Sequence, residues 1–560
     1  MVDGGRLLKA APLGAADPPQ RRRTDAPTVV LHWLVALLLL VSLATGFRIA
    51  ADAQDAVWSR AVAALAPQGE VVMWHIWSAC ALIAAAAGSV VFLRRSRLAR
   101  RVAFDASRMR ALRSPSRRRR WQSINVLIYW LAFVLVLAAA GTGTLMYVGS
   151  TIVSQPAVAA LHRGMAWGLI GYVVLHVAGQ MLMAGWRGLL TMVSPHLAYG
   201  TAAGVSLVTV AAVAATLVIV DAAMVRPLVV ARVTDPPRLD GDPGDAAWQM
   251  ANPVTIRTSR GANLPSGEVA VTVRAVHDGT HAYFLFEWPD ATRSQKHLPL
   301  QKTASGWRVV QHGYERQDEN AYYEDKFAVM LARTSRLAAL RTAHLGPKPL
   351  DGLPGPSGER GLHYTTDGSI VDIWHWKSVR TGPMGQMDDH YFGPPLPPPD
   401  TTDERYTGGY AQDPARRGGF LQNLKDLDGT LVPRFLPKDP AVLERLGLIV
   451  LDPEASDEGE WWLPMSLVLP FTPERDALYP VGTIVPSVIL RGPFEGDRGD
   501  VAAVGAWSKG WWRLEVRREI ETGSRFDVAI ADGTYLWVAV FDHPQTRHSQ
   551  HLHPVRIELR

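Results

Sequence analysis

Long apolar runs separated by charged segments fill the first 225 residues of this 560-residue chain. A helix needs ~20 mainly apolar residues to cross the hydrocarbon core of a bilayer. The chain contains five runs of about that length with few charged side chains inside them, which predicts five membrane-spanning helices. The predicted spans are 28–50, 71–93, 122–148, 160–185 and 201–225.

From residue 226 onward the apolar positions form short runs with a period of two, which is the pattern of half-buried strands. Many short strands separated by turns rich in Gly, Pro and Asp predict an antiparallel β-sandwich. Two Pro- and Gly-rich stretches, 346–361 and 393–419, are expected to be long loops inserted into it. The clearest strand patterns are EVAVTVRAV at 268–276, HAYFLFEW at 281–288, WWRLEVR at 511–517 and YLWVAVF at 535–541.

These patterns predict a multidomain protein, with an all-α transmembrane bundle of five spans followed by an all-β sandwich with long loop insertions. A length of 560 residues also favours more than one domain. The expected divisions are a basic N-terminus at 1–27, a four-helix domain at 28–200, a fifth transmembrane helix at 201–225 and the β domain at 226–560.

Positive charge is concentrated beside the apolar spans. Residues 94–120 carry twelve Arg and a single Asp, and residues 1–27 carry five Lys or Arg against three Asp. Basic segments flanking membrane helices usually remain in the cytoplasm. The N-terminus and the 94–120 loop are therefore expected inside a bacterial inner membrane, with the β domain in the periplasm. An Arg-rich loop between two spans is poorly placed to bind nucleic acid, and no signal-peptide cleavage pattern precedes the first span.

Four histidines inside the spans form two candidate pairs of metal ligands. His162 and His176 are fourteen residues apart, which places them within ~40° on one helix face and ~21 Å apart in depth. With the predicted topology, His75 shares the outer depth with His162, and His32 shares the inner depth with His176. The single cysteine, Cys80, excludes covalent haem attachment through a Cys-x-x-Cys-His motif. The pairs therefore predict two non-covalent, bis-histidine b haems. The alternative is that the histidines form hydrogen bonds between helices.

Several motifs of the bundle resemble a known family. Thr28–Trp33 (TVVLHW) opens the first helix, Thr45-Gly46 closes it, and the third helix carries Asn125, Tyr129 and Gly141-Thr142-Gly143. Together with the His-x13-His pair, these residues resemble the di-haem cytochrome b subunits of nickel–iron hydrogenases and formate dehydrogenases over about residues 25–190. The resemblance implies electron exchange between the membrane quinone pool and a redox partner on the outer face. The family's Arg before the first ligand is missing here, which puts contacts to the haem propionates in doubt.

The β domain resembles a second family. The runs 235–248 (DPPRLDGDPGDAAW), 323–329 (YEDKFAV), 371–377 (VDIWHWK) and 510–521 with 538–542 are similar to the haem-binding γ subunit of ethylbenzene dehydrogenase. The resemblance covers roughly residues 230–560 and implies one haem b in the sandwich.

In that family the haem is held by a Met before the Val-Asp-Ile-Trp strand and by a Lys near the C-terminus. This sequence instead carries Leu362-His363-Tyr364 before the strand and Arg547–His553 (RHSQHLH) near its end. The resemblance therefore implies His363 as one axial ligand and His548 as the other, with His551 as the second choice for the latter. The alternative is a sandwich without haem.

The sequence is compatible with three functions. The first is an electron-transfer protein that links quinone to an extracytoplasmic redox protein or oxidoreductase subunit through the haems. The second is a membrane-anchored recognition module whose sandwich binds carbohydrate or a partner protein. The third is a reductase that acts on a small substrate at the outer haem. No Ser/His/Asp set, phosphate loop or nicotinamide fingerprint supports another chemistry. Paired histidines favour the first, as an electron-transfer component rather than a stand-alone catalyst.

Overall fold

The computed structural model describes most of the chain. The described residues are 25–51, 65–149, 153–190, 193, 200–311, 321–346, 350–355, 362–398, 406–427, 429–447, 451–456 and 459–560. Most of the basic N-terminal segment, and parts of both expected loop insertions, lie outside these residues.

Five helices among the described residues are long and apolar enough to cross a membrane, and they coincide with the five predicted spans. The third begins at Arg117, five residues before its predicted start, because Arg117–Arg120 add a polar turn that hydropathy does not mark. Between the second and third helices lie a short 3-10 helix, Leu98–Arg101, and α4, Ala106–Ala111. The long helices are α1 (Ala26–Ala51), α3 (Val71–Arg95), α5 (Arg117–Tyr147), α6 (Gln155–Leu190) and α7 (Thr201–Ala223).

Two compact units divide the chain, and the long helices contribute to both. Unit 1 comprises Met1–Leu39, Ala81–Phe133 and Leu169–Ala214, so among the described residues it consists of helices and the segments that connect them. Unit 2 comprises Leu40–Cys80, Val134–Gly168 and Ala215–Arg560, so it contains helical segments and the whole β domain.

Close helix packing in unit 1 depends on small residues. The Ser206 hydroxyl of α7 donates to the Gly88 carbonyl of α3 at 2.8 Å. A Cβ at Gly88 would lie 2.4 Å from Val210 Cγ2 of α7, so any larger residue would push the two helices apart. In the same way, a Cβ at Gly179 of α6 would collide with the ring of Trp121 of α5. Such close approach supplies the van der Waals contact that holds membrane helices together.

The β domain is built on a sheet of twelve hydrogen-bonded strands. These are β1 (Arg226–Arg232), β2 (Val254–Thr258), β3 (Val269–His277), β4 (His281–Pro289), β7 (Lys326–Ala332), β10 (Val371–Lys377), β11 (Asp388–Phe392), β12 (Tyr410–Gln412), β21 (Ala502–Ser508), β22 (Trp511–Glu519), β23 (Tyr535–Phe541) and β24 (Val555–Leu559). Their order is β12-β11-β10-β7-β23-β24-β1-β3-β4-β22-β21, and β2 pairs with β3.

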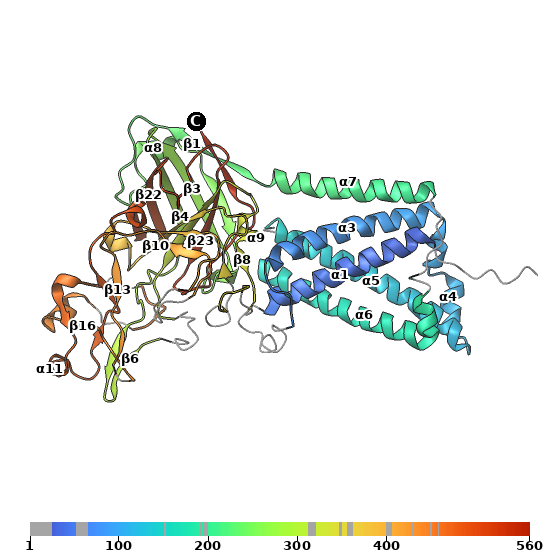
Figure 1. Ribbon diagram of the computed structural model, residues 1–560, viewed down its shortest axis with the longest axis horizontal. Coiled ribbons are helices and arrows are strands. Elements are labelled where there is room, and N and C mark those ends of the chain that lie inside the picture. Colours follow the sequence, from blue (N-terminus) through green and yellow to red (C-terminus); the bar gives the residue numbers. More distant parts are fainter. Residues whose placement is uncertain are drawn as a thin grey trace, which may run out of the picture. The chain divides into compact units, whose positions relative to one another are not determined.

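The sheet folds into two layers, as the sequence predicts (Figure 1). Phe284 of β4 contacts Trp374 of β10 with ring centres 5.8 Å apart, and Trp376 of β10 contacts Trp512 of β22 at 5.0 Å. These pairs join opposite ends of the strand path, so one large core lies between the layers. Most pairs are antiparallel, but β1 pairs in parallel with both β24 and β3 and so connects the layers.

Shorter elements fill the long connections of the β domain. The stretch 393–419, which the sequence predicts to be a loop, contains the short strand β12, because three residues of pairing leave too little periodicity to detect in a sequence. The additional strands are β5 (Leu300–Thr303), β6 (Gly306–Val309), β8 (Ala343–His344), β9 (Leu362–His363), β13 (Phe420–Gln422), β14 (Lys425–Leu427), β15 (Thr430–Val432), β16 (Phe435–Pro437), β17 (Leu463–Pro464), β18 (Val468–Pro470), β19 (Ile484–Val485) and β20 (Val488–Leu490). The short helices are α8 (Ala246–Met250), α9 (Ala338–Arg341), α10 (Ala441–Arg445) and α11 (Pro473–Asp476).

Candidate functional site

The four histidines of the helices lie in the two pairs expected from the sequence. In unit 2, the rings of His75 on α3 and His162 on α6 have centres 6.2 Å apart, with an interplanar angle of 88°. In unit 1, the rings of His32 on α1 and His176 on α6 have centres 6.3 Å apart, with an interplanar angle of 46°.

Both separations suit an iron ion between the two rings. A bond from a metal to an imidazole nitrogen is about 2 Å long, and that nitrogen lies about 1 Å from the ring centre. Two imidazoles on opposite sides of one metal therefore have ring centres about 6 Å apart. Direct ring stacking or a hydrogen bond between the rings would not require the same separation in two different pairs. The residues present thus fit two bis-histidine haems.

A threonine orients each imidazole of the unit 2 pair. The Thr142 hydroxyl donates to the Ala138 carbonyl at 2.8 Å, so its oxygen can accept from His162 Nδ1–H, which lies 3.0 Å away. His75 repeats this arrangement: its Nδ1 lies 3.1 Å from Thr45 Oγ1 and 3.0 Å from the carbonyl of Ser42. With the proton held on Nδ1, the Nε2 lone pair of each ring is free to coordinate a metal.

The glycine that follows each threonine leaves room for the imidazole. A Cβ at Gly46 would lie 3.1 Å from His75 Cε1, and a Cβ at Gly143 would lie 3.4 Å from His162 Cε1. The Thr-Gly pairs of α1 and α5 therefore perform the same task on the two histidines. The sequence showed both pairs as family motifs, but the role of the threonine hydroxyls became visible only in the structure.

The unit 1 pair has aromatic neighbours. The ring of Tyr172 stacks on His176 with centres 5.5 Å apart and an angle of 26°. Trp33 lies edge-on to His32 at 5.6 Å. These contacts restrict rotation of both imidazoles.

In the β domain, His363 and His548 flank the same sheet face. The ring of His363 on β9 stacks on Phe392 of β11 with centres 4.9 Å apart, and His548 packs on Phe541 of β23 at 5.0 Å. Burial, and then the proximity of His548, lowers the pKa of His363 to about 4, so its imidazole is neutral at physiological pH. The side chain of His363 is nevertheless exposed to solvent.

The ring nitrogens separate the two candidates for the second ligand. His548 Nδ1 donates to the Ser549 carbonyl at 2.8 Å, and its Nε2 remains available. In His551, Nε2 accepts from the backbone N–H of Val538 at 2.9 Å, while Nδ1 donates to the His553 carbonyl at 2.8 Å. Both nitrogens of His551 are used in holding β23 to the following loop. The geometry favours His548 over His551.

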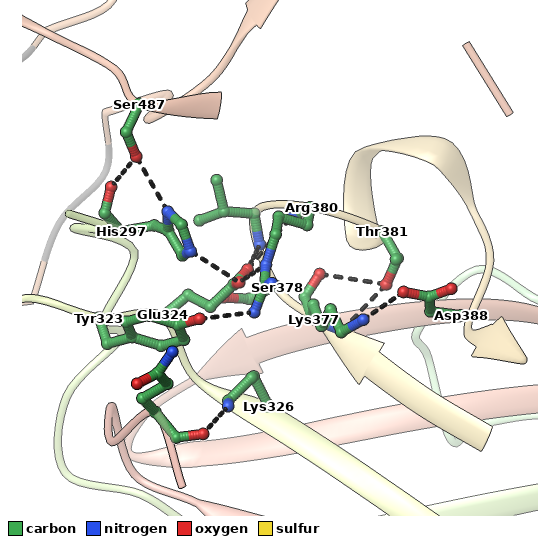
Figure 2. A network of polar contacts seen from close by, with 12 residues as sticks. His297, Tyr323, Glu324, Lys326, Lys377, Ser378, Arg380, Thr381, Asp388 and Ser487 are labelled. Atoms are coloured by element: carbon green, nitrogen blue, oxygen red, sulfur yellow. Dashed lines mark hydrogen bonds and ion pairs between the residues drawn. The ribbon is translucent and has the colours of Figure 1, made fainter. Parts of the chain in front are cut away.

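Figure 2 shows a buried network of polar and charged groups that includes Lys326. Lys326 Nζ lies 4.1 Å from the ring centre of Phe541, the residue on which His548 packs, and donates to the Gln545 carbonyl at 2.7 Å. Arg380 pairs with Glu324, and Lys377 pairs with Asp388. Arg498 adds a second cation to Asp388 at 2.6 Å.

Among the described residues of this network, the three cations of Lys377, Arg380 and Arg498 pair with the two carboxylates of Glu324 and Asp388. Although burial alone would raise it, Arg380 holds the pKa of Glu324 below its usual value. The pKa of Asp388 is likewise held well below its usual value by His390 and Lys377, against the effect of burial. Both carboxylates are therefore ionised, and the surplus positive charge can balance an anionic ligand. This network could not be predicted from the sequence, because its members are spread over more than 170 residues.

Comparison with protein families identifies the domains. The model of the ethylbenzene dehydrogenase family matches residues 245–552, more than half of the chain. The chain belongs to the ethylbenzene dehydrogenase family. A second model, prokaryotic cytochrome b561, matches residues 23–195. The ethylbenzene dehydrogenase domain is therefore fused to a membrane cytochrome b domain, as the sequence motifs indicated.

Other comparisons add little to the ethylbenzene dehydrogenase assignment. No curated protein matches the chain. Two solved structures of a family 9 carbohydrate-binding module from Caldicellulosiruptor kristjanssonii are similar to it, one in complex with cellotriose and one with glucose. The first is 8% identical, with a TM-score of 0.21, and the match covers 60% of this chain and 94% of the module. The second is 7% identical, with a TM-score of 0.21, and the match covers 59% and 95%.

The assignments agree with the geometry of the bundle. The cytochrome b domain and the five apolar helices make this member of the ethylbenzene dehydrogenase family a multi-pass membrane protein that binds b-type haem and transfers electrons.

Proposed function

We propose that this protein carries electrons between the quinone pool and a redox partner outside the cytoplasm of a bacterium. His32 with His176, and His75 with His162, would be the axial ligands of two b haems in the bundle. A third haem in the sandwich would have His363 and His548 as its ligands. Bound haem supplies one-electron oxidation and reduction of its iron.

The separation of ring centres in the two bundle pairs carries this proposal. Pairs at 6.2 and 6.3 Å fit one iron each, and a simple membrane anchor would need neither. His162 and His176 lie on one helix, fourteen residues apart, so a haem at each would form a relay through the depth of the bilayer. The alternative function, a membrane-anchored module that binds carbohydrate or a partner protein, does not explain why the bundle contains two histidine pairs.

Two further observations support the proposed quinone and orientation. The motifs of the bundle resemble subunits that exchange electrons with quinone. The Arg-rich loop at 94–120 supports a cytoplasmic location for the loop and the N-terminus, in the inner membrane of a bacterium. With five spans, the β domain would then lie in the periplasm, where a soluble redox protein or an oxidoreductase subunit could reach it.

Within the sandwich, the protein would position the third haem by three means. His363 and His548 present neutral imidazoles, and Phe392 and Phe541 hold the two rings in place. Lys326 and its neighbours supply positive charge, which suits the two propionate groups of a haem.

Substitution of the bundle histidines tests the proposal. His75→Ala and His162→Ala should each remove the same component from the reduced-minus-oxidised spectrum, because a six-coordinate haem needs both ligands. His32→Ala and His176→Ala should both remove the other component. The measurement is haem content per chain with the spectrum of each variant, in membranes and after purification.

His281→Ala is the matched control. His281 lies at the start of β4 and is partly exposed, with an ion-pair contact to Asp278 at 3.7 Å, so its loss should leave every haem in place. If His75→Ala and His32→Ala removed the same component, the proposed pairs would be wrong. If neither pair affected haem, the electron-transfer proposal would fail.

A further inference from the structure

Five aspartates converge around one arginine inside the β domain. The arginine is Arg518 of β22, which belongs to one layer of the sandwich, and two of the aspartates belong to strands of the other layer. The five are Asp372 of β10, Asp389 of β11, Asp413 directly after β12, Asp500 before β21 and Asp527 after β22.

The charges of this cluster do not balance. Arg518 Nη1 donates to Asp372 Oδ2 at 2.9 Å, and Nη2 pairs with Asp527 Oδ2 at 2.5 Å. The side chain of Arg518 is 1% exposed, so its positive charge interacts with groups inside the protein and not with solvent. One guanidinium cannot neutralise five carboxylates, and uncompensated charge in a protein interior is very costly.

Asp413 has no partner that would explain its burial. It is 2% exposed, and neither of its carboxylate oxygens has a hydrogen-bond partner among the described residues. Asp389 is fully buried, and its Oδ2 likewise has no hydrogen-bond partner there. Buried polar atoms are nearly always satisfied in folded proteins, so this exception requires an explanation.

Oxygens of three of these aspartates are close enough together to share an ion. One ligand oxygen each from Asp389, Asp413 and Asp527 lie within 4.8 Å of one another. Two oxygens that bind the same Ca²⁺ at roughly 2.4 Å are at most about 4.8 Å apart. We propose that Asp389, Asp413 and Asp527 bind a calcium ion in the β domain, with Asp500 at the edge of the site.

Calcium is the cation that this set of ligands selects. Every ligand is a carboxylate oxygen, which suits a hard cation and disfavours zinc or copper. Ca²⁺ accepts several carboxylates in irregular geometry, whereas Mg²⁺ requires near-octahedral positions and usually retains water. In the absence of a cation, burial and then the nearby Asp527 raise the pKa of Asp413 to about 8, so that protons occupy the cluster instead.

An ion at this position would connect segments that are distant in the sequence. It would connect one layer, through β11 and the segment after β12, to the loop that follows β22. Strand β22 belongs to the other layer. The site is separate from the candidate haem site: Asp389 faces the core, while His390 and Phe392 of the same strand face the opposite side. The expected role of calcium is therefore to stabilise the sandwich.

Calcium binding by the purified, haem-loaded full-length chain tests this proposal. After dialysis against CaCl₂, elemental analysis should find calcium at about one ion per chain, and EGTA should remove it. The calorimetric unfolding midpoint should be roughly 5 °C higher in saturating CaCl₂ than in EGTA. Tb³⁺ should show luminescence sensitised by tryptophan, because the ring of Trp374 lies 5.3 Å from Arg518 Cζ. CaCl₂ should abolish that luminescence.

Asp413→Asn should abolish calcium binding and the calcium-dependent rise of the midpoint, while the variant still unfolds cooperatively in EGTA. Asp389→Asn provides the same test if Asp413→Asn does not fold. Asp426→Asn is the control, because Asp426 is exposed and only caps the turn to Gly429. The proposal is overturned if the chain binds no calcium and unfolds at the same midpoint in CaCl₂ and EGTA. Equal loss of calcium in Asp426→Asn and Asp413→Asn would also overturn it.

Discussion

At the scale of single residues, two threonine hydroxyls determine how the unit 2 histidines face each other. Thr45 and Thr142 each lie about one hydrogen-bond length from Nδ1 of their histidine, at 3.1 and 3.0 Å. An acceptor on Nδ1–H fixes the tautomer and makes Nε2 more basic. Substitution of such an outer partner commonly lowers metal affinity ~10–100-fold.

Thr142→Val should therefore weaken haem binding at the His162 pair and raise its midpoint potential. A less basic imidazole stabilises the ferric state less, while valine preserves the shape of the side chain. Redox titration of the purified protein measures the potential. Thr209→Val on α7 is the control, because the Thr209 hydroxyl donates only to the carbonyl of Val205 in its own helix, at 2.9 Å. An unchanged potential in Thr142→Val would show that the hydroxyl has no role at the histidine.

His297 shows how a buried histidine makes stability depend on pH. The Ser487 hydroxyl donates to the His297 carbonyl at 2.5 Å, so its oxygen accepts from His297 Nδ1–H at 2.9 Å. Nε2 carries no proton and faces Glu324 Oε1 at 3.9 Å (Figure 2). Burial, and then the charge of Arg380, lowers the pKa of His297 to about 3. Glu324 opposes this shift and Lys326 adds to it.

The unfolded state therefore binds one more proton than the folded state between about pH 6.5 and pH 3. Stability should fall as the pH is lowered through this range, by up to about 1.4 kcal/mol for each pH unit from this group. His297→Gln retains a donor for Ser487 but does not titrate. The difference in unfolding free energy between wild type and variant should change with pH below 6.5 and remain constant above it. A difference that is independent of pH would show that His297 does not titrate in this way.

At the scale of elements, each strand of the sandwich presents different chemistry on its two faces. On β11, the buried Asp389 faces the core, and Phe392 on the other face supports the ring of His363. The alternation of side chains along the strand keeps these two groups apart. The loop after β23 also gives its two histidines different environments. His551 Nε2 accepts from the backbone N–H of Val538, whereas His548 uses only Nδ1 in a hydrogen bond to the backbone, so its Nε2 is available.

This difference predicts the outcome of substituting the two histidines. His548→Ala should remove the proposed haem of the β domain and leave the domain folded. His551→Ala should retain that haem but lower the unfolding midpoint, because the N–H of Val538 loses its buried acceptor, which costs ~1–3 kcal/mol. Haem content and circular dichroism of the full-length variants distinguish the results. Loss of the haem in His551→Ala, with His548→Ala unaffected, would reverse the assignment of the ligand.

At the scale of the whole molecule, the sequence predicted most of the architecture. The five spans and the strand-rich domain follow from hydrophobic periods of sufficient length, and both are confirmed. The histidine pairs could be predicted because a spacing of fourteen residues on one helix places His162 and His176 on the same face at two different depths. The Asp cluster around Arg518 and the network around Glu324 could not be predicted. Both assemble from strands that are distant in the sequence, and a period of two shows only which positions are buried.

The position of β1 also determines when the sandwich can form. β1 follows α7 directly, and its neighbours are β3 and β24, so the first strand of the domain needs the last one as its partner. Residues Arg226–Val230 pair with Val555–Leu559 across more than 300 residues of intervening chain. Such long loop closure is slow and entropically costly. During synthesis, the edges of β1 and β23 would remain exposed until β24 leaves the ribosome and reaches the same compartment. Folding of this domain therefore cannot be completed before β24 has been synthesised.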